Sequence, residues 1–446
     1  MSHPGSPLVQ IVTLGCARND TDSEQLASRI LTGGMALTDD PGEADIILVN
    51  TCGFIEAAKK DSIDLLLDLA DARRPGAKII ATGCMAQRYG AELADSLPEL
   101  DAVLGFSAYD DIAARLRDVL GVDETSEKAS PSDGASSNIV RARLDAGPYA
   151  PLKIASGCDR RCAFCAIPAI RGAYRSRPIA DIVAEARWLV GQGVREIMLV
   201  SENSTGYGKD TGDREALPRL LRELGGVEGL AWVRVSYLQP AEVTPALLDA
   251  MAEVGNVVGY FDLSFQHASG PLLRRMRRFG DTESFLELLA QVRLRCPHAG
   301  VRTSALVGFP GETEDDLKEL HHFLQQARAD AIGVFGFSDE EGTEAHGLRG
   351  HLSPDEIDQR TRATSELADW LMESRAAERL GERVQVLVES VDDSVVGRAA
   401  HQGPEVDGTT TLIFQDHQPL PAVGDLVWAK VIETDGVDLL AACLNL

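Results

Sequence analysis

The chain contains no long apolar run, and no segment approaches the roughly 18 consecutive apolar residues that a membrane-spanning helix needs. Its first ten residues, MSHPGSPLVQ, also lack the basic and apolar parts of a secretory signal peptide. From these two absences we expect a cytoplasmic protein with no membrane partner.

Basic residues are scarce, since 43 Lys and Arg stand against 69 Asp and Glu, for a net charge of -26. Nonspecific binding to nucleic acid depends on clustered Lys and Arg that neutralise phosphates. Direct nucleic-acid binding is therefore disfavoured, and a basic protein partner or a small substrate is favoured. Hydrophobic residues make up 44% of the 446 residues, which is enough to form buried cores. The length predicts about two to four domains.

Cysteines are also few for this length. The eight present do not fit the dense disulfide framework of a small secreted protein. In a large intracellular chain such cysteines are more often ligands or catalysts, and their positions decide which.

Three of the cysteines end three similar segments near the amino terminus. The runs VQIVTLGC, ADIILVNTC and GAKIIATGC each predict a buried strand, ending at Cys16, Cys52 and Cys84. A helical segment follows each strand, the first starting near Asp22 and Ser23. This alternation predicts a parallel sheet, in which the carboxyl ends of the strands share one edge. Any one of these cysteines could pack as a small apolar residue, but three at equivalent strand ends favour a shared cluster.

Residues 121–138, GVDETSEKASPSDGASSN, have almost no apolar side chains and predict a linker. A second alternating series follows, in which six apolar runs are separated by helical segments. Six such units predict an open, partial TIM-type barrel, a (β/α)6 arrangement with its active edge at the carboxyl ends of the strands.

The last part of the chain has a different pattern. A long helical stretch over about 355–380 is followed by short strand-like runs at 384–391, 410–414 and 425–433. Short strands with turns predict a small terminal β-barrel. The predicted fold class is thus α/β, with a parallel amino-terminal domain, a partial barrel and a small carboxyl-terminal β-barrel.

A second cysteine group, Cys158, Cys162 and Cys165, lies in SGCDRRCAFC after the first barrel strand. A structural zinc site usually has four protein ligands, and a ferredoxin cluster is usually bound by four cysteines. The next cysteine is Cys296, so three thiolates on a four-iron cluster would leave one iron open. The alternative is a loop of buried or zinc-binding thiols. Cys296 and Cys443 have no partners in sequence, and we expect both to pack as apolar residues.

This CxxxCxxC loop resembles that of the radical S-adenosylmethionine enzymes. The whole chain is similar to their methylthiotransferases, in the order of a three-cysteine domain, a radical S-adenosylmethionine barrel and a TRAM domain. Within them it resembles the RimO type, through LGCARNDTDSE, NTCGFIEAA, TGCMAQRY, SGCDRRCAFCAIPAIRG, RSRP, SFQHAS, LVGFPGETEDD and PEVDG. The resemblance implies domains at 8–124, 144–375 and 377–446.

The resemblance also implies the chemistry. It implies two 4Fe-4S clusters, one on Cys16, Cys52 and Cys84 and one on Cys158, Cys162 and Cys165, the latter with an open iron that binds S-adenosylmethionine. In RimO-type enzymes a 5'-deoxyadenosyl radical takes hydrogen from the β-carbon of an aspartate in small-subunit ribosomal protein twelve, and a methylthio group is then built there. Such a carbon is not acidic, so no side chain is assigned as a catalytic acid or base. An unidentified reductant and an unidentified sulfur source are further partners.

Four residues at strand ends are candidate cofactor contacts. Glu202 and Asn203 end the second barrel strand, where the superfamily commonly contacts the methionyl amino group, although RimO-type sequences more often have Gln at the first position. Gly308 and Gly311 follow the fifth strand, and glycine lets backbone approach a cofactor closely. A plain strand-end turn at 202–203 and a helix N-cap near Thr313 are the alternatives.

Charge distribution separates the remaining possibilities. Residues 376–446 carry twelve acidic and four basic residues, which repel RNA and attract a basic ribosomal protein, unless the acidic surface is merely solvated. The basic run LLRRMRRFG is expected to be a solvated helix face, and His267 is expected to be structural.

Two other functions remain open. A tRNA methylthiotransferase of the MiaB type would share the architecture but needs a basic docking surface, which this composition lacks. A noncatalytic iron-sulfur electron carrier would not need open coordination positions. GFI after Cys52 and QHAS around His267 favour the protein-modifying type.

Overall fold

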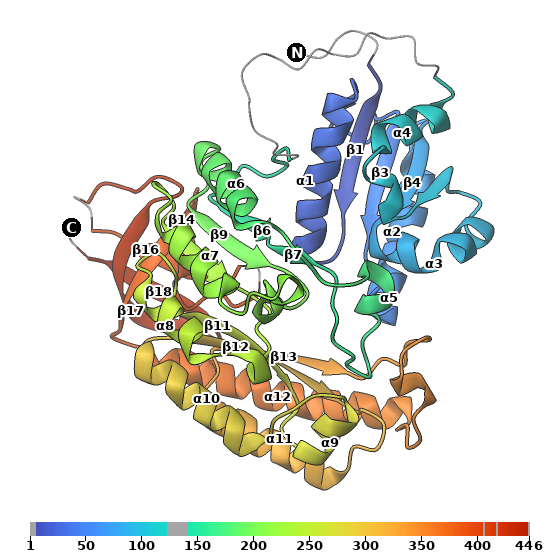
Figure 1. Ribbon diagram of the computed structural model, residues 1–446. Helices are drawn as coiled ribbons and strands as arrows, with labels where there is room; N and C mark the ends of the chain where they lie inside the picture. Colours follow the sequence, from blue (N-terminus) through green and yellow to red (C-terminus); the bar gives the residue numbers. More distant parts are fainter. Residues whose placement is uncertain (1–5, 123–140, 405, 416–417, 445–446) are drawn as a thin grey trace. The chain divides into compact units, whose positions relative to one another are not determined.

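A computed structural model describes residues 6–122, 141–404, 406–415 and 418–444 (Figure 1). The chain forms two compact units. Unit 1 comprises Met1–Ala146 and Ala166–Gly172, and unit 2 comprises Gly147–Cys165 and Ala173–Leu446. The predicted linker lies outside the described residues from position 123 to 138. Within the described ranges, no helix is long and apolar enough to span a bilayer.

Unit 1 is built on a parallel five-stranded sheet, as the alternating pattern predicted. Its strand order is β2-β1-β3-β4-β5. The strands are β1 (Leu8–Thr13), β2 (Ala36–Leu37), β3 (Ile46–Thr51), β4 (Lys78–Thr82) and β5 (Ala102–Leu104). Every residue of β3 is buried, which is typical of a central parallel strand covered on both faces.

Helices cover both faces of this sheet. Apolar side chains of α1 (Ala17–Thr32) and α4 (Ile112–Leu120) form one core with the sheet, and those of α2 (Glu56–Ala72) and α3 (Gly83–Ser96) form another. The short helix α5 (Ile167–Arg171) also belongs to unit 1, although its sequence directly follows Cys165 of unit 2.

The predicted start of the first helix near Asp22 and Ser23 is wrong. The helix begins at Ala17, and Cys16 is its N-cap. The hydroxyl of Ser23 does not cap the helix, because it accepts hydrogen bonds from Thr13 and Asn50 of the adjacent strands. Polar side chains that seemed to mark a helix terminus therefore attach the middle of α1 to the sheet.

Unit 2 contains the predicted partial barrel. Its parallel strands are β6 (Tyr149–Lys153), β9 (Glu196–Val200), β10 (Trp232–Val235), β11 (Tyr260–Gln266), β12 (Gly300–Val307) and β13 (Ala331–Gly336). They form two three-stranded sheets, β6-β9-β10 and β11-β12-β13. Two isolated parallel bridges connect β10 and the residues after it to β11 and the residues before it. This chain-ordered sheet confirms the (β/α)6 prediction.

Helices pack around these strands. They are α6 (Ile179–Gly191), α7 (Ala216–Gly225), α8 (Pro245–Glu253), α9 (Gly270–Arg275), α10 (Thr282–Arg295), α11 (Glu314–Ala327) and α12 (Pro354–Glu378). The last three lie side by side along the outside of the strands (Figure 1). The long helix expected over about 355–380 is α12.

The tail folds into the predicted small β-barrel, with the closed strand order β14-β15-β16-β18-β17. The strands are β14 (Arg383–Val391), β15 (Val395–Ala399), β16 (Thr410–Ile413), β17 (Leu426–Asp435) and β18 (Asp438–Cys443). Buried and exposed residues alternate along much of β17, because its side chains point in turn to the barrel core and outward.

Buried charges attach this terminal barrel to the strands of the same unit. Glu196, at the start of β9, accepts hydrogen bonds from Arg234 at 2.7 Å and from Arg398 of β15 at 2.5 Å. The side chains of all three are at most 3% exposed. A second connection joins Tyr260 of β11 to Asp407, at 2.5 Å. The terminal barrel and the partial barrel therefore form one compact unit.

Candidate functional site

The first triplet, Cys16, Cys52 and Cys84, lies at the carboxyl ends of three adjacent strands of unit 1. Cys16 follows β1, Cys52 follows β3, and Cys84 lies in the first turn of α3 after β4. The loop before Cys16 passes so close to Cys52 that a Cβ on Gly15 would lie 3.2 Å from the Cys52 Sγ atom. Gly15 also has a φ of +104°, which few other residues adopt. The sheet thus gathers the three cysteines at one edge.

Polar contacts fix the loops that carry these cysteines. The Ser62 hydroxyl donates to the Cys52 carbonyl at 2.7 Å and accepts from the Cys52 backbone N–H at 3.1 Å. Asn19 donates to the Leu14 carbonyl at 2.6 Å. The guanidinium of Arg171 lies 3.3 Å from the Cys84 Sγ atom. Each loop is therefore held by a partner that lies elsewhere in unit 1.

The three thiols of the first triplet differ in their electrostatic surroundings. Burial raises the pKa of Cys16, but the charges of Arg18 and Arg171 and two backbone N–H groups outweigh it, so the pKa is lowered overall. The pKa values of Cys52 and Cys84 are raised, chiefly by burial, and Arg171 opposes the shift at Cys84. Charge on Cys16 and Cys52 also raises the pKa of Cys84, so the three sulfur atoms lie within electrostatic reach of one another. Two arginines favour the thiolate forms that bind metals.

The second triplet, Cys158, Cys162 and Cys165, lies in unit 2 after the short strand β7 (Ala155–Ser156). The Cys165 N–H donates to the Cys162 carbonyl at 3.1 Å and closes a tight turn. Burial raises the pKa of the Cys158 thiol, and charge on Cys162 and Glu202 acts in the same direction. Glu202, a candidate cofactor contact, therefore lies close to this loop.

An ion-pair network ties the second triplet to the other candidate residue, Asn203. Arg160, between the first two cysteines, donates to Glu242 at 2.6 Å. The Asn203 amide donates to the same carboxylate at 2.9 Å, and the Lys209 ammonium lies 3.0 Å from it. Burial raises the pKa of Glu242, but these donors and the charge of Arg160 lower it overall, which keeps the carboxylate ionised.

Arg278 is a buried cation beside the triplet. Its guanidinium lies 3.9 Å from the Cys162 Sγ atom and donates to the Ser264 carbonyl, with 5% of the residue exposed. The expectation of a solvated helix face is confirmed for Arg274 and Arg275 of α9, whereas Arg277 is exposed in the turn after the helix, and the expectation is wrong for Arg278. Arg277 has left-handed backbone, with φ of +55°, and this turn after α9 directs the next side chain inward.

Gly308 and Gly311 follow β12 and have left-handed backbone, with φ of +79° and +85°. A Cβ on Gly308 would lie 2.8 Å from Ile357, and one on Gly311 would lie 2.9 Å from Arg275. The left-handed backbone therefore already favours glycine at both positions, and packing against Ile357 adds to this at Gly308. Thr313 is the N-cap of α11 and forms a capping box, as one alternative predicted.

His267 and Glu312 form a buried pair beside this glycine loop. The His267 Nε2 atom lies 3.6 Å from a Glu312 carboxylate oxygen, and neither side chain is exposed. Burial lowers the pKa of His267 to about 4, so the ring is neutral at physiological pH. Glu312 also accepts a hydrogen bond from the Gly308 N–H at 2.9 Å. His267 is therefore a neutral, fully buried residue of unit 2, and a structural role stays a prediction.

Each triplet offers three thiol side chains, the ligand type that iron-sulfur clusters use. In the part of the chain that the structure describes, no group of three His, Cys, Asp or Glu side chains is arranged around one ion. In a four-iron cluster each thiolate binds a different iron, so the sulfur atoms need not converge on a single point. Cys296 and Cys443 instead contact apolar cores, as expected.

Five residues beside the triplets were not assigned from the sequence: Asn19, Asp22, Arg171, Glu242 and Arg278. Asn19, Asp22 and Arg171 lie within the LGCARNDTDSE and AIPAIRG segments that carry the resemblance. Those segments could have drawn attention to them. Glu242 follows the third barrel strand, at the edge where functional residues collect.

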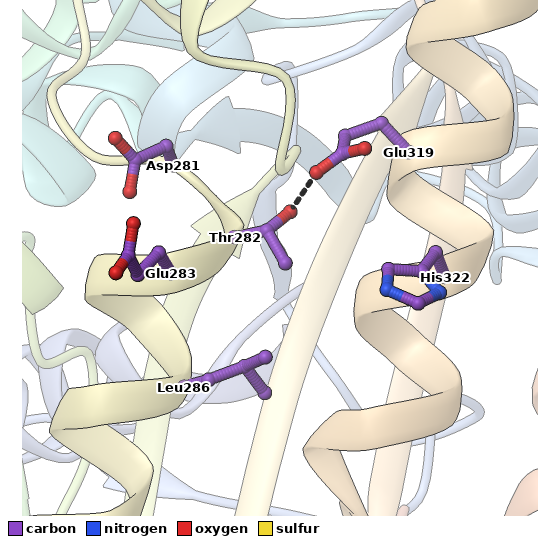
Figure 2. Close-up of a pocket in the computed structure, with 6 residues that line it drawn as sticks. All are labelled: Asp281, Thr282, Glu283, Leu286, Glu319 and His322. Carbon is purple, nitrogen blue, oxygen red and sulfur yellow. Dashed lines mark hydrogen bonds between the residues drawn. The ribbon is translucent and has the colours of Figure 1, made fainter.

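A pocket between α10 and α11 lies apart from the cysteine triplets in its lining residues (Figure 2). It is lined by Asp281, Thr282, Glu283, Leu286, Glu319 and His322, and the Thr282 hydroxyl donates to Glu319 at 2.5 Å. No cysteine lines it, and its three carboxylates would repel the carboxylate of a methionyl group. The two triplets therefore remain the candidate sites.

Three family models match successive parts of the chain. The uncharacterized protein family UPF0004 matches residues 8–105, the radical SAM superfamily matches residues 152–324, and the TRAM domain matches residues 380–444. They cover, in order, the sheet of unit 1, most of the partial barrel, and the terminal β-barrel.

A solved structure is similar to this chain in fold. The solved structure of the radical S-adenosylmethionine methyltransferase TsrM from Kitasatospora setae, with cobalamin and a [4Fe-4S] cluster bound, covers 74% of each chain at 16% identity with a TM-score of 0.52. This likeness concerns the fold alone.

Full-length relatives carry the assignment further. A protein of Cutibacterium acnes named ribosomal protein uS12 methylthiotransferase RimO is 53% identical, over 98% of both chains. One of the same name from a Nocardioides species is 55% identical, over 97% of this chain and 96% of its own. With this identity along nearly its whole length, the chain belongs to the RimO family of radical S-adenosylmethionine methylthiotransferases.

Proposed function

We propose that this protein adds a methylthio group to the β-carbon of an aspartate in small-subunit ribosomal protein uS12. One observation carries the proposal: the chain holds two separate cysteine triplets, one at the carboxyl ends of three parallel strands of unit 1 and one on a single loop after β7 in unit 2. A single triplet suits radical cleavage of S-adenosylmethionine, whereas addition of sulfur and a methyl group calls for a second site. The shared name of its relatives supports the same substrate.

The proposed cofactors are two 4Fe-4S clusters and S-adenosylmethionine. The first triplet would hold one cluster, and the second triplet would hold the other with an open iron for S-adenosylmethionine. When bound, the second cluster and S-adenosylmethionine together would supply the radical chemistry that removes hydrogen from an unactivated carbon. No side chain of the protein needs to act as an acid or base in that step.

The proposed role of the protein's own side chains is to bind and orient S-adenosylmethionine. We propose that Glu202 and Asn203 accept the methionyl ammonium, because Glu202 lies near Cys158 and Asn203 is tied through Glu242 to Arg160. A carboxylate and an amide oxygen are suitable acceptors for an ammonium.

Gly308 and Gly311 are proposed to line the cofactor site with backbone. Their loop follows β12, at the carboxyl edge of the strands where TIM-type barrels bind ligands. The Glu312 contact with the Gly308 N–H fixes the path of this loop.

We further propose functional domains at 8–124, 144–375 and 377–446. Support comes from the order of the three family matches, from the end of α4 and the start of β6, and from the end of α12 at Glu378, close to the last boundary. The exposed acidic side chains Asp392 and Asp393 of the terminal barrel would face the basic substrate. A ribosomal protein substrate implies a cytoplasmic location and, from the charge of the chain, no direct nucleic-acid contact. A reductant and a sulfur source complete the set of proposed partners.

The deciding experiment offers the anaerobically reconstituted protein two substrates in parallel, purified uS12 and unmodified tRNA. Mass spectrometry would follow the added mass of a methylthio group on each. The proposal expects modification of one uS12 aspartate and none of tRNA. Modification of tRNA with untouched uS12 would move the chain to the MiaB-type function. No modification of either, with reversible reduction of both clusters, would support an electron carrier.

A further inference from the structure

Arg171 makes an unusual set of contacts beside the first triplet. One terminal nitrogen, Nη2, lies 3.3 Å from the Cys84 Sγ atom and 2.8 Å from the Asn19 Oδ1 atom. The other, Nη1, donates to Asp22 at 2.8 Å. A guanidinium has five N–H donors in a fixed plane, so these contacts also fix its direction.

The Arg171–Asp22 ion pair is buried, which strengthens its electrostatic effect on neighbouring groups. The side chains of Arg171 and Asp22 are 4% and 3% exposed. An ion pair so shielded from water acts on its neighbours at a lower effective dielectric than a surface pair does. Because Asp22 contacts Nη1 while Nη2 faces Cys84, the positive end of the pair points at the sulfur atom.

The chain segment that supplies Arg171 is itself fixed in unit 1. Ala166 and Ile170 pack with Cys84 in a small apolar cluster, and the Arg171 guanidinium lies 4.8 Å from the centre of the Phe106 ring. This segment, Ala166–Gly172, directly follows Cys165 in sequence but belongs to the unit of the first triplet. Arg171 therefore cannot turn away from Cys84 without disrupting these contacts.

We propose that Arg171 is a positioning residue of the first cluster, which hydrogen-bonds the Cys84 thiolate and raises the reduction potential of that cluster. The inference rests on the proposed function, because it requires the first triplet to hold a cluster. Reduction adds one electron from an external reductant and one negative charge to the cluster, with no bond formed or broken in the protein. A hydrogen bond to a ligand sulfur and a nearby positive charge stabilise the more negative, reduced form.

The test isolates the first cluster. The full-length chain with Cys158, Cys162 and Cys165 changed to Ala would be reconstituted with iron and sulfide, and this parent would be titrated with dithionite while the reduced-cluster EPR signal is followed. Into it would be placed Arg171→Gln, Arg171→Lys and Asp22→Asn. Arg115→Gln is the matched control, because Arg115 is an exposed arginine of α4 in the same unit, paired with Asp111.

The expected shifts have opposite signs. Arg171→Gln should move the midpoint potential to a more negative value, and Arg171→Lys should retain part of the parent value. Asp22→Asn should move the midpoint to a more positive value, because it removes the negative partner of the guanidinium. Arg115→Gln should leave it unchanged. A role in packing alone would not give opposite shifts for the two members of one ion pair.

A buried Asp22 left without its arginine could unfold unit 1, so the double variant Asp22→Asn with Arg171→Gln removes both charges. Its midpoint should be more negative than that of Asp22→Asn alone. The inference is overturned if Arg171→Gln and the double variant bind as much iron as the parent and titrate at the parent midpoint. If the parent itself binds no iron, the proposed function fails instead, so the two failures are distinguishable.

Discussion

Arg398 of the terminal barrel donates to Glu196 of the partial barrel at 2.5 Å, with both side chains at most 3% exposed. Arg234 donates to the same carboxylate at 2.7 Å. A buried carboxylate between two arginines is stable only while all three remain together, because removing one partner leaves uncompensated charge. The junction between the two barrels is therefore a site where one substitution should have a large effect.

Glu196→Gln should lower the free energy of unfolding by about 3–5 kcal/mol, since it removes the carboxylate that pairs with buried Arg234 and leaves Arg398 with Glu389 alone. Urea unfolding followed by circular dichroism would measure the change. Glu228→Gln is the matched control, because Glu228 is exposed in the same unit and should change stability by no more than about 0.5 kcal/mol. Equal effects of the two substitutions would contradict a stabilising role for the buried triad.

The same carboxylate should make stability depend on pH. Burial raises the pKa of Glu196, but the charges of Arg398 and Arg234 outweigh it and the pKa is lowered overall. A group whose pKa is depressed by folding stabilises the folded state above its unfolded pKa, about 4.3 for Glu, and this contribution is lost as pH falls. The stability difference between the wild type and Glu196→Gln should therefore be constant near pH 7 and shrink below about pH 4.3. A difference that grew on acidification would contradict this sign.

The sequence predicted what depends on local pattern. Cys16, Cys52 and Cys84 could be placed at one sheet edge because each ends an apolar run, and parallel strands bring such ends together. The tight spacing of the second triplet likewise places its cysteines on one loop. Periodicity and short spacings therefore carried both the fold class and the candidate ligands.

Contacts that depend on distant packing were not predictable in this way. Arg278 resembles a solvated residue in the sequence, and only the backbone turn at Arg277 directs it toward Cys162. Asp22 was expected near the start of a helix, yet it lies inside α1 and pairs with Arg171 of a remote segment. The sequence pattern does not show which distant residue a charged side chain will contact. The roles of these charged residues could therefore be seen only in the structure.

Iron content should follow the two triplets. Anaerobically reconstituted protein should contain about eight iron atoms per chain, four for each cluster, and changing Cys158, Cys162 and Cys165 together to Ala should leave about half. Iron and zinc would be measured by elemental analysis of both proteins. Stoichiometric zinc, or full iron in the triple variant, would show that the assignment of ligands is wrong. Cys296→Ala is the control and should retain all the iron, because Cys296 packs against the core.

The two triplets should also differ in the step that they support. Cys162→Ala should abolish both 5'-deoxyadenosine formation and modification of uS12, since the second triplet is proposed to hold the cluster that binds S-adenosylmethionine. Cys52→Ala should still form some 5'-deoxyadenosine but no methylthiolated product. Chromatography of the nucleoside and mass spectrometry of uS12 would separate these outcomes. Normal product from Cys52→Ala would remove the first triplet from sulfur insertion.

Docking of the basic substrate should depend on the acidic terminal barrel. Asp392 and Asp393 are exposed after β14, and charge reversal there with Asp392→Lys and Asp393→Lys should lower kcat/KM for uS12 roughly two- to tenfold at low salt, since complementary charge speeds association. The difference should shrink as salt rises, because at 0.1 M ionic strength exposed charges are screened over about 10 Å. Initial rates of uS12 modification at several salt concentrations would measure both effects.

The matched control changes the same charge elsewhere. Asp68 and Asp71 are exposed on α2 of unit 1, so Asp68→Lys with Asp71→Lys alters the net charge of the chain by the same amount. If the terminal barrel contacts the substrate, only the Asp392 and Asp393 variant should lose most of the salt dependence. Equal losses from both pairs would mean that the charge of the whole chain attracts uS12, and that the terminal barrel has no specific role in docking.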